Sequence, residues 1–389
     1  MKVVFKALLV LLLITSIFIY YDNYIKVDNG VDENNIILGQ SSAISGAASD
    51  LGISFRDGAL SYFEYINSMG GVNGRKIKLI TYDDKYEPSL AVENSLKLIT
   101  EDKVFALFGE VGTPTSKAVL KIVNEYKVPF LTPFSGAELL RKPFNPLVVN
   151  FRASYYGETE EIVKYLVDKL KMKNIAIFYQ SDSYGKDGLR GVKIALNKRN
   201  IELSASGAYI RNTLSITTAL NSIKKVNPQA VIMIGAYKPC AEFIKRAKKE
   251  GLTKTIFANI SFVGSRSLLN ELEGKTDNLI ISQVVPLPCI ETNEAVSEYK
   301  KIFLKSNPKN VCGFVSFEGF LSAKLIVEAL RQSREPLSRK SFISSFERLS
   351  DNSLKGIEIE LSKNDHQAMN DIYLTIYKDG ELLTIDGEK

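Results

Sequence analysis

The stretch Val104-Phe-Ala-Leu-Phe-Gly-Glu-Val-Gly-Thr-Pro-Thr-Ser116 indicates the fold of this chain. Val104 to Phe108 is an apolar run of buried-strand length, and two glycines follow it. Thr113 offers an N-cap hydroxyl, and Pro114 suits the first position of a helix. The pattern predicts a strand, a turn and a helix. The first-turn N–H groups of that helix, including that of Ser116, can bind a small anion such as a carboxylate. An ordinary strand-to-helix turn is the simpler interpretation of this stretch taken alone.

The same pattern recurs twice. Val128 to Glu138 contains a strand and a small-residue turn, with Ser135 and Glu138 spaced as a capping box. Ala230 to Cys240 repeats it, with a proline opening the helix. In an open parallel sheet such turns meet at the carboxyl ends of the strands, where doubly wound folds bind their ligands.

Strand and helix patterns alternate along most of the chain, which predicts an α/β protein with parallel sheets. A second series of such units begins near Glu158, so the chain is expected to form two similar lobes. Two prolines at 286 and 288 mark a crossing back to the first lobe. Ile357 to Leu361 and Asp371 to Tyr377 are expected to be closing strands.

Composition argues against several kinds of function. The net charge of +6 is spread along 389 residues without a basic and aromatic cluster, so no nucleic-acid partner is expected. His366 is the single histidine and is interpreted as a surface-turn residue, so a histidine metal site or a Ser-His-Asp triad is not expected. The spacings of dinucleotide and phosphate-binding loops are absent. We therefore predict no catalytic residue, metal or cofactor.

The cysteines are three in number, Cys240, Cys289 and Cys312, and lie far apart in the sequence. Their spacing does not match a zinc or redox motif, and the odd count leaves at least one free thiol. Cys289 with Cys312 is the pairing to test first. Three unpaired, mostly buried thiols are the alternative.

The N-terminus carries an export signal or a membrane anchor. Lys2 and Lys6 precede an apolar run that ends at Tyr21, and no small-residue cleavage pattern follows it. The run approaches the length that spans a bilayer, which favours an anchor at residues 3–21. The remainder of the chain is expected to be periplasmic or otherwise extracytoplasmic.

Several motifs resemble the type I periplasmic binding proteins, in particular the leucine/isoleucine/valine-binding receptors of ABC transporters. Gly70-Gly-Val-Asn-Gly-Arg-Lys76 followed by Asp83-Asp84 is the most specific of them, and Arg56-Asp-Gly-Ala59 and Asp365-His-Gln367 also match. The resemblance covers nearly the whole chain after the leader. It implies two doubly wound parallel-sheet lobes joined by a three-crossover hinge, with a small ligand enclosed between them.

The resemblance also implies a division of the chain. Residues 1–21 would be the signal or anchor and 22–35 a linker. Residues 36–154 and 287–360 would form the first lobe, and 155–286 and 361–389 the second. The residues expected at the ligand are Leu51, Glu110, Val111, Gly112, Thr113, Ser135, Gly136, Tyr155, Tyr156, Asp182, Tyr237 and Asn259. Thr113, Ser135 and the backbone around them would hold a carboxylate.

Two departures from the family pattern bear on the ligand. Leu51 stands where an aromatic residue often faces the ligand. Amino-acid binders of this family commonly offer an acidic group from the second lobe to the ammonium, but Asn259 to Ser265 contains none. A buried ammonium without a counter-charge is costly, so the carboxylate would come from Glu110 or Asp182, or the ligand is not an α-amino acid.

Each site residue also has a structural interpretation. The tyrosines can be wall packing, Asp182 can cap a helix, Asn259 can satisfy a turn, and Glu110 is solvent-facing unless its loop folds inward. The leading expectation is a receptor that captures an amino acid or related carboxylate for an ABC transporter permease. The alternatives are a membrane-tethered sensor that signals to a partner in the membrane and, more weakly, an α/β enzyme.

Overall fold

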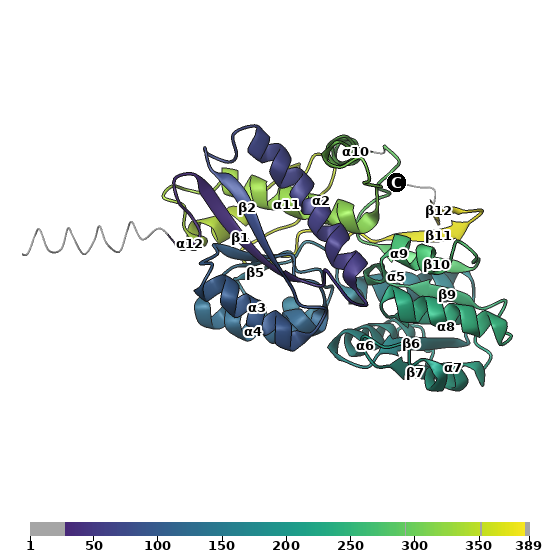
Figure 1. The fold of residues 1–389 in the computed structure, drawn as a ribbon. Coiled ribbons are helices and arrows are strands. Elements are labelled where there is room, and N and C mark those ends of the chain that lie inside the picture. The colour runs from purple at the N-terminus through teal and green to yellow at the C-terminus, as the bar shows by residue number, and fades with distance from the viewer. Residues whose placement is uncertain (1–27, 292, 351, 386–389) are drawn as a thin grey trace, which may run out of the picture.

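Two separate sheets organise the chain (Figure 1). The computed structural model describes residues 28–291, 293–350 and 352–385. The predicted leader therefore lies outside the described residues. Of the helices that are described, none has the length and apolar character needed to cross a membrane.

The first sheet is wholly parallel and has the order β2-β1-β3-β4-β5. Its strands are β1 (Asn35–Ser42), β2 (Lys76–Asp83), β3 (Ala106–Phe108), β4 (Phe130–Leu131) and β5 (Val148–Val149). The helices of this lobe are α2 (Ser49–Ser68), α3 (Pro88–Thr100), α4 (Thr113–Tyr126), α10 (Glu294–Ser306), α11 (Phe314–Arg331) and α12 (Arg339–Phe346), with a short 3-10 turn η1 (Glu138–Leu140).

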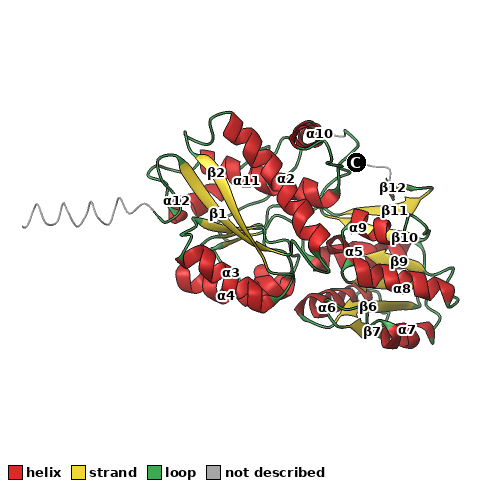
Figure 2. Ribbon diagram, viewed as in Figure 1, coloured by secondary structure: helices red, strands yellow, loops and turns green. Residues whose placement is uncertain are grey.

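Both faces of the first sheet are covered by helices (Figure 2). Strand β3 shows why, since its alternate side chains enter different cores. Leu107 joins the core beneath α3 and α4. Phe108 packs against Phe55 and Phe63 of α2, with ring centroids 5.7 Å and 5.6 Å away. The apolar run that predicted a buried strand is thus buried on both sides.

The second sheet has the order β12-β11-β10-β9-β8-β6-β7. Its strands are β6 (Ile175–Gln180), β7 (Ala205–Tyr209), β8 (Ala230–Ile234), β9 (Ile256–Asn259), β10 (Leu279–Gln283), β11 (Tyr373–Lys378) and β12 (Glu381–Thr384). Strands β6 to β10 pair in parallel, whereas β11 and β12 add an antiparallel hairpin at one edge. The helices are α5 (Tyr155–Val163), which continues as a π-helix η2 (Lys164–Lys169), then α6 (Ser183–Asn197), α7 (Thr217–Lys224), α8 (Tyr237–Lys249), η3 (Ser261–Val263) and α9 (Ser265–Glu271).

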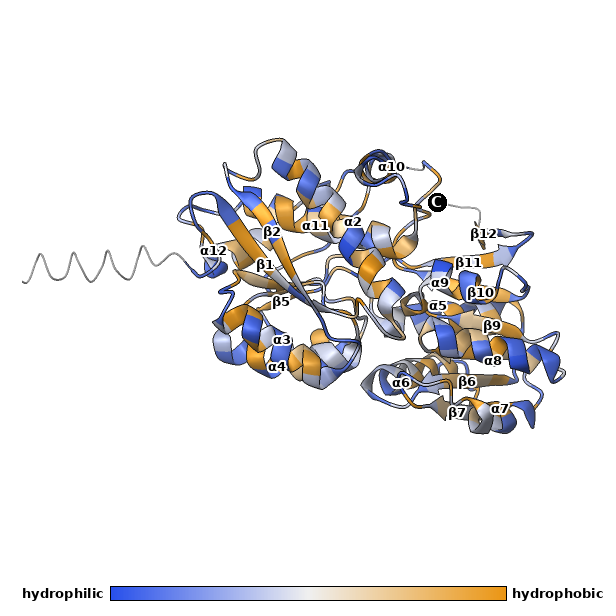
Figure 3. Ribbon diagram, in the orientation of Figure 1, coloured by the Kyte–Doolittle hydropathy of each residue, from blue (hydrophilic) through white to orange (hydrophobic). Residues whose placement is uncertain are grey.

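Hydrophobic residues concentrate on the strands and on the helix faces that cover them (Figure 3). Helices α2 and α11 come unusually close, because glycines lie where they cross. A Cβ on Gly58 would lie 1.9 Å from the Ser316 carbonyl oxygen, and one on Gly319 would lie 2.0 Å from that of Phe55. The close crossing ties the C-terminal part of the first lobe to its N-terminal part.

The chain passes between the lobes three times, at residues 150–154, 284–293 and 347–372. The first and third crossings run side by side. The Asn150 N–H donates to the His366 carbonyl, and the Ala368 N–H donates to the Asn150 carbonyl, each at 2.8 Å. The interpretation of His366 as a surface residue is wrong, because this pairing buries it to 2% exposure. Ile357 to Leu361, expected to be a strand, has no strand assignment and belongs to this third crossing.

Candidate functional site

The loop after β3 turns sharply into α4. Gly112 has a φ of +104° and is the N-cap of the helix, so Thr113 is its first residue and does not cap it. The Thr115 hydroxyl instead donates to the Val111 and Gly112 carbonyls, at 2.7 Å and 2.8 Å. The Ser116 N–H, expected to be free for an anion, donates to the Gly112 carbonyl at 3.1 Å. The side chain of Thr113 is left to face the interior of the site.

Three buried hydroxyls meet beside this loop. The Thr113 and Ser135 oxygens are 2.8 Å apart, and the Tyr155 hydroxyl lies 3.4 Å from that of Thr113. The capping box expected from Ser135 and Glu138 is not formed, because the N-cap of η1 is Ala137. The Ser135 hydroxyl is thereby available to the cluster, although it also accepts from the Ala137 N–H at 3.3 Å.

Gly136 contacts Tyr155 of this cluster through its backbone. The Tyr155 N–H donates to the Gly136 carbonyl at 2.7 Å, and a Cβ at Gly136 would lie 2.6 Å from the tyrosine ring. Val111 pairs with Phe134 in a parallel bridge. Tyr155 opens α5 of the second lobe, so the hydroxyl cluster joins residues from both lobes.

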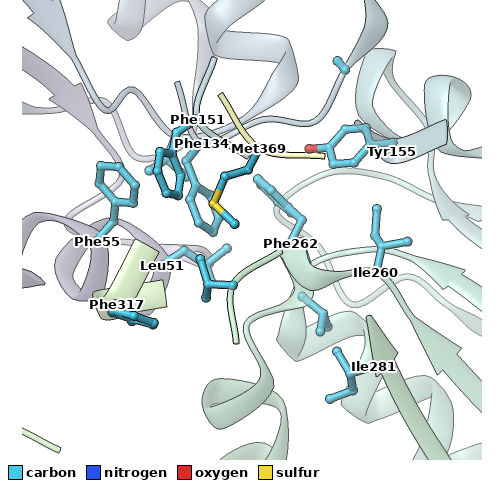
Figure 4. Packing of buried hydrophobic residues seen from close by; sticks show 14 of the residues in the cluster. Leu51, Phe55, Phe134, Phe151, Tyr155, Ile260, Phe262, Ile281, Phe317 and Met369 are labelled. Atoms are coloured by element: carbon cyan, nitrogen blue, oxygen red, sulfur yellow. The ribbon is translucent and has the colours of Figure 1, made fainter. Parts of the chain in front are cut away.

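An aromatic group fills the space between the lobes next to the hydroxyls. Phe262, on η3 of the second lobe, extends toward Phe134 of the first (Figure 4). Its ring centroid lies 4.5 Å from that of Tyr184, 5.5 Å from that of Phe134 and 6.1 Å from that of Tyr86. Leu51 lies beside this group, and a Cβ at Gly264 would lie 2.4 Å from the Leu51 side chain. The lobes are therefore closed on each other in this structure.

Asp182 is the N-cap of α6 and is fully engaged. It accepts from the backbone N–H groups of Tyr184 and Gly185, from the Gln180 amide at 2.7 Å, and forms an ion pair with Arg211. These four partners leave it little capacity to bind an ammonium group.

The other second-lobe predictions divide into two groups. Tyr237, the first residue of α8, and Asn259, the last residue of β9, are both buried. Neither amide atom of the Asn259 side chain has a hydrogen-bond partner among the described residues. Tyr156 is only partly buried and faces Asp187 on α6, so it lies apart from the hydroxyl cluster.

Glu110 is buried to 2% exposure, contrary to the solvent-facing interpretation. Burial, and then the nearby Asp84 carboxylate, raise the pKa of Glu110 well above its usual value. This shift favours the uncharged form of Glu110 and weakens it as a source of negative charge.

A buried ionic cluster that the sequence did not reveal lies at the first crossing. Arg152 forms an ion pair with Glu318 of α11, at 3.0 Å between Nε and Oε1, and donates to the Ser261 hydroxyl at 2.7 Å. Glu158 of α5 accepts from the Ser261 N–H at 2.7 Å and from the Ser282 hydroxyl at 2.6 Å. We call Arg152, Glu158 and Glu318 the hinge cluster.

The charges of the hinge cluster do not balance. One guanidinium faces two carboxyl groups, so one negative charge is left over when both acids are ionised. Burial raises the pKa of Glu318 to about 7 and also raises that of Glu158, while Arg152 opposes both shifts. Among the described residues, Glu158 Oε1 and Arg152 Nη1 have no hydrogen-bond partner. These two atoms remain available to a ligand.

The described residues contain no group of three histidine, cysteine or acidic side chains that could hold a metal ion. What the arrangement offers chemically is a set of hydroxyls, a guanidinium and carboxyl groups between two closed lobes. Groups of these kinds can form hydrogen bonds and ion pairs with a small polar molecule enclosed between the lobes.

Two α/β lobes joined by three crossings and closed over a buried polar cluster define a type I periplasmic binding protein. The chain belongs to the leucine/isoleucine/valine-binding family of these proteins: the model of the family described as "Periplasmic binding protein" matches residues 35–381. Members of this family bind ligands and are not enzymes, and this protein is likewise not an enzyme.

Individual relatives agree with this assignment. An "Amino acid binding protein" of Pseudomonas aeruginosa is 25% identical, in a match that covers 56% of this chain and 59% of the relative. A "Leu/Ile/Val-binding protein" of Citrobacter freundii is 23% identical over 82% of this chain and 86% of its own. The solved structure of a "possible leucine/isoleucine/valine-binding protein" from Rhodopirellula baltica is 33% identical, with a TM-score of 0.86, and covers 92% of this chain and 97% of its own.

Proposed function

We propose that this protein is an extracytoplasmic receptor that captures an amino acid or a related carboxylate between its lobes and delivers it to an ABC transporter. The observation that carries the proposal is the buried contact of Thr113, Ser135 and Tyr155, which joins hydroxyls from both lobes. The names of the relatives from Pseudomonas aeruginosa and Citrobacter freundii support the ligand class.

Hydrogen bonds to a ligand carboxylate would replace the hydrogen bonds that the hydroxyls make to one another. The Thr113 and Ser135 hydroxyls each have a proton to donate, and their mutual hydrogen bond of 2.8 Å is available for replacement by two bonds to a ligand oxygen. Hydrogen bonds to a charged acceptor contribute about 1.5–3 kcal/mol. The exchange therefore favours a ligand with a negative end.

The ammonium of an amino acid would be met by Glu158. This side chain reaches the Ser261 N–H from α5, so it brings a carboxylate to the segment that lacks an acidic residue of its own. Its free Oε1 atom and the uncompensated charge of the hinge cluster both suit a cation. Burial raises the pKa of both Glu110 and Glu158, but the Arg152 guanidinium opposes the shift at Glu158, and Asp182 already has four partners. Glu158 is therefore the better source of counter-charge.

The ligand would stabilise closure by contacting both lobes at once. A ligand shifts the balance between open and closed forms only through its stronger binding to one of them. A site with Thr113 on one lobe and Glu158 on the other provides that difference, because neither lobe alone contacts both ends of the ligand.

The proposal is tested by titrating the purified protein with leucine, isoleucine and valine in a calorimeter, and in parallel by thermal shift. A ligand at about a hundredfold excess over its Kd stabilises the fold by roughly 2.7 kcal/mol. In Thr113→Ala the affinity for a carboxylate ligand should fall about tenfold or more. Thr100→Ala, on the exposed part of α3, is the matched control. Unchanged affinity in Thr113→Ala would rule out this carboxylate site.

A second titration tests the role of Glu158. Isocaproate has the leucine skeleton without its ammonium group, so it separates the two ends of the ligand. In Glu158→Gln the affinity for leucine should fall about tenfold or more, whereas that for isocaproate should not fall. Glu161→Gln, on the same helix but near the surface, should change neither. An equal loss for both ligands would show that Glu158 acts only through the fold.

A further inference from the structure

Two of the three cysteines come together in the structure although 22 residues separate them in the sequence. The Cys289 sulfur lies 3.7 Å from the Cys312 carbonyl oxygen, and the two thiols interact with each other. Cys289 is exposed and Cys312 partly exposed, so small reagents can reach the pair. The third thiol, on Cys240, is fully buried in α8, and burial raises its pKa.

Helix α10 holds the two cysteine-bearing loops in place. Tyr299 of this helix accepts from the Gly313 N–H at 3.2 Å and bonds to the Ser316 hydroxyl at 2.7 Å, which fixes the chain next to Cys312. Lys300 of the same helix forms an ion pair with Glu291 at 3.0 Å, close to Cys289. Contacts from one helix therefore reach both cysteine-bearing segments.

The surroundings of the two cysteines affect how readily each thiol ionises. Burial, followed by the neighbouring Cys289, raises the pKa of Cys312 to about 11, and the Lys300 ammonium opposes that shift. The exposed Cys289 is thus the better first nucleophile and Cys312 the second, because Cys312 reacts once its partner has become an electrophile.

We infer that Cys289 and Cys312 are a disulfide-forming pair that locks the loop before α11 when the protein meets a disulfide oxidant. The Cys289 thiolate attacks a small-molecule disulfide RS–SR and releases one RS⁻. The Cys312 thiolate then attacks the Cys289 sulfur and releases the second thiol. Two protein thiols are oxidised with loss of two electrons and two protons, and RS–SR is reduced to two RSH.

The bond would act next to a contact between the lobes. Arg266 of α9 donates to the Val311 carbonyl at 3.1 Å, directly beside Cys312. A cavity of about 220 Å³ is lined there by residues of α2, α9 and the start of α11. Fixing the segment at Cys312 would fix the part of the cavity wall that Val311 and Gly313 provide.

The test exposes the reduced full chain to glutathione disulfide and counts free thiols after denaturation. The reduced protein has three thiols, and the expected oxidised protein has one. Its mass should fall by about 2 Da, and a digest should contain one peptide pair linked through Cys289 and Cys312. Cys240→Ala should give the same linked pair.

Single variants separate this outcome from others. Oxidation should raise the Tm of the natural sequence. Cys289→Ser and Cys312→Ser should form no internal bond and should show no such rise. A chain that keeps glutathione on Cys289 without passing it on, or that links only to a second chain, would overturn the inference. So would a linked peptide that contains Cys240.

Discussion

Glu318 carries the largest pH sensitivity that the hinge cluster imposes on this protein. Its carboxyl group is buried to 3% exposure beside Arg152, with Glu158 as a second acid nearby. Burial is the main reason that the pKa of Glu318 rises to about 7, with Arg152 opposing the shift and Glu158 adding to it. Protonation of such a group stabilises the folded state relative to the unfolded state.

The pH dependence of stability follows from the upward direction of this pKa shift. The folded-state pKa of Glu318 is raised from 4.5, so its contribution is complete below pH 4.5 and is lost as pH rises through 7. At about 1.4 kcal/mol per pKa unit, the loss is at most about 3–4 kcal/mol. We expect the free energy of unfolding in urea to fall between pH 5 and pH 7.5 by less in Glu318→Gln than in the natural sequence.

Glu328 provides the control for that comparison, since it lies on the same helix, is only partly buried and forms an ion pair with Arg331. Glu328→Gln should leave the slope of stability against pH unchanged. Parallel curves for Glu318→Gln and the natural sequence would contradict the assignment of this pH dependence to Glu318.

At the scale of elements, the strand-turn-helix units were predictable because each depends on neighbours in the sequence. The run before Gly109 and the proline at 114 predicted β3 and α4, and both are present. The detail at the helix start was wrong, because Gly112 and not Thr113 is the N-cap. Only the conformation of Gly112, with its positive φ, decides between the two.

That glycine gives a prediction about α4. Gly112 and Gly70 have φ values of +104° and +101°, so an alanine at either position is similarly strained. A Cβ at Gly112 would also lie 2.1 Å from the Tyr86 ring, whereas one at Gly70 has no atom within 4 Å. Gly112→Ala should therefore lose about 1–3 kcal/mol more stability than Gly70→Ala, measured by urea unfolding. Equal losses would mean that Tyr86 moves aside without cost.

The hinge cluster could not be predicted in the same way. Arg152 and Glu318 are 166 positions apart, and both are types of residue that usually lie on the surface. Nothing in their local sequence distinguishes them from exposed charges. Glu158 was equally hidden, because it occupies an ordinary first helical turn. The residues of the hydroxyl cluster could be predicted to lie together because they follow strands that the pattern identified. Tyr156, predicted in the same way, lies apart from that cluster beside Asp187.

At the scale of the whole molecule, partly exposed polar contacts between the lobes, which we call the rim, hold the lobes together. Arg211 of the second lobe pairs with Glu87 of the first at 2.7 Å, and Asn212 donates to the same carboxylate. Deeper in, the Gln180 amide donates to the Tyr86 hydroxyl at 3.2 Å. These bonds stabilise closure, and none of them involves the hydroxyls of Thr113, Ser135 and Tyr155 or the hinge cluster.

Arg211→Ala should therefore favour the open form. The Glu87 carboxylate of the pair is 40% exposed, so the pair contributes about 0.2–1 kcal/mol, or up to about fivefold in the balance of forms. The radius of gyration from X-ray scattering should rise, and leucine should dissociate faster. Salt should have less effect on the variant than on the natural sequence.

Arg331→Ala removes a surface ion pair within one helix and serves as the comparison. It should leave both scattering and dissociation unchanged. If Arg211→Ala scatters like the natural sequence at every salt concentration, closure is maintained by the aromatic packing around Phe262 and not by the rim.

The described chain starts on one lobe and finishes on the other. The Asp28 carboxylate accepts from the Arg339 N–H of α12, and the Ile385 N–H donates to the Leu374 carbonyl of β11 (Figure 1). A donor and an acceptor fluorophore joined at these two places would move relative to each other as the halves swing. The efficiency of energy transfer between the fluorophores would then report how much of the protein has bound its ligand. Such a sensor would not require a labelled ligand.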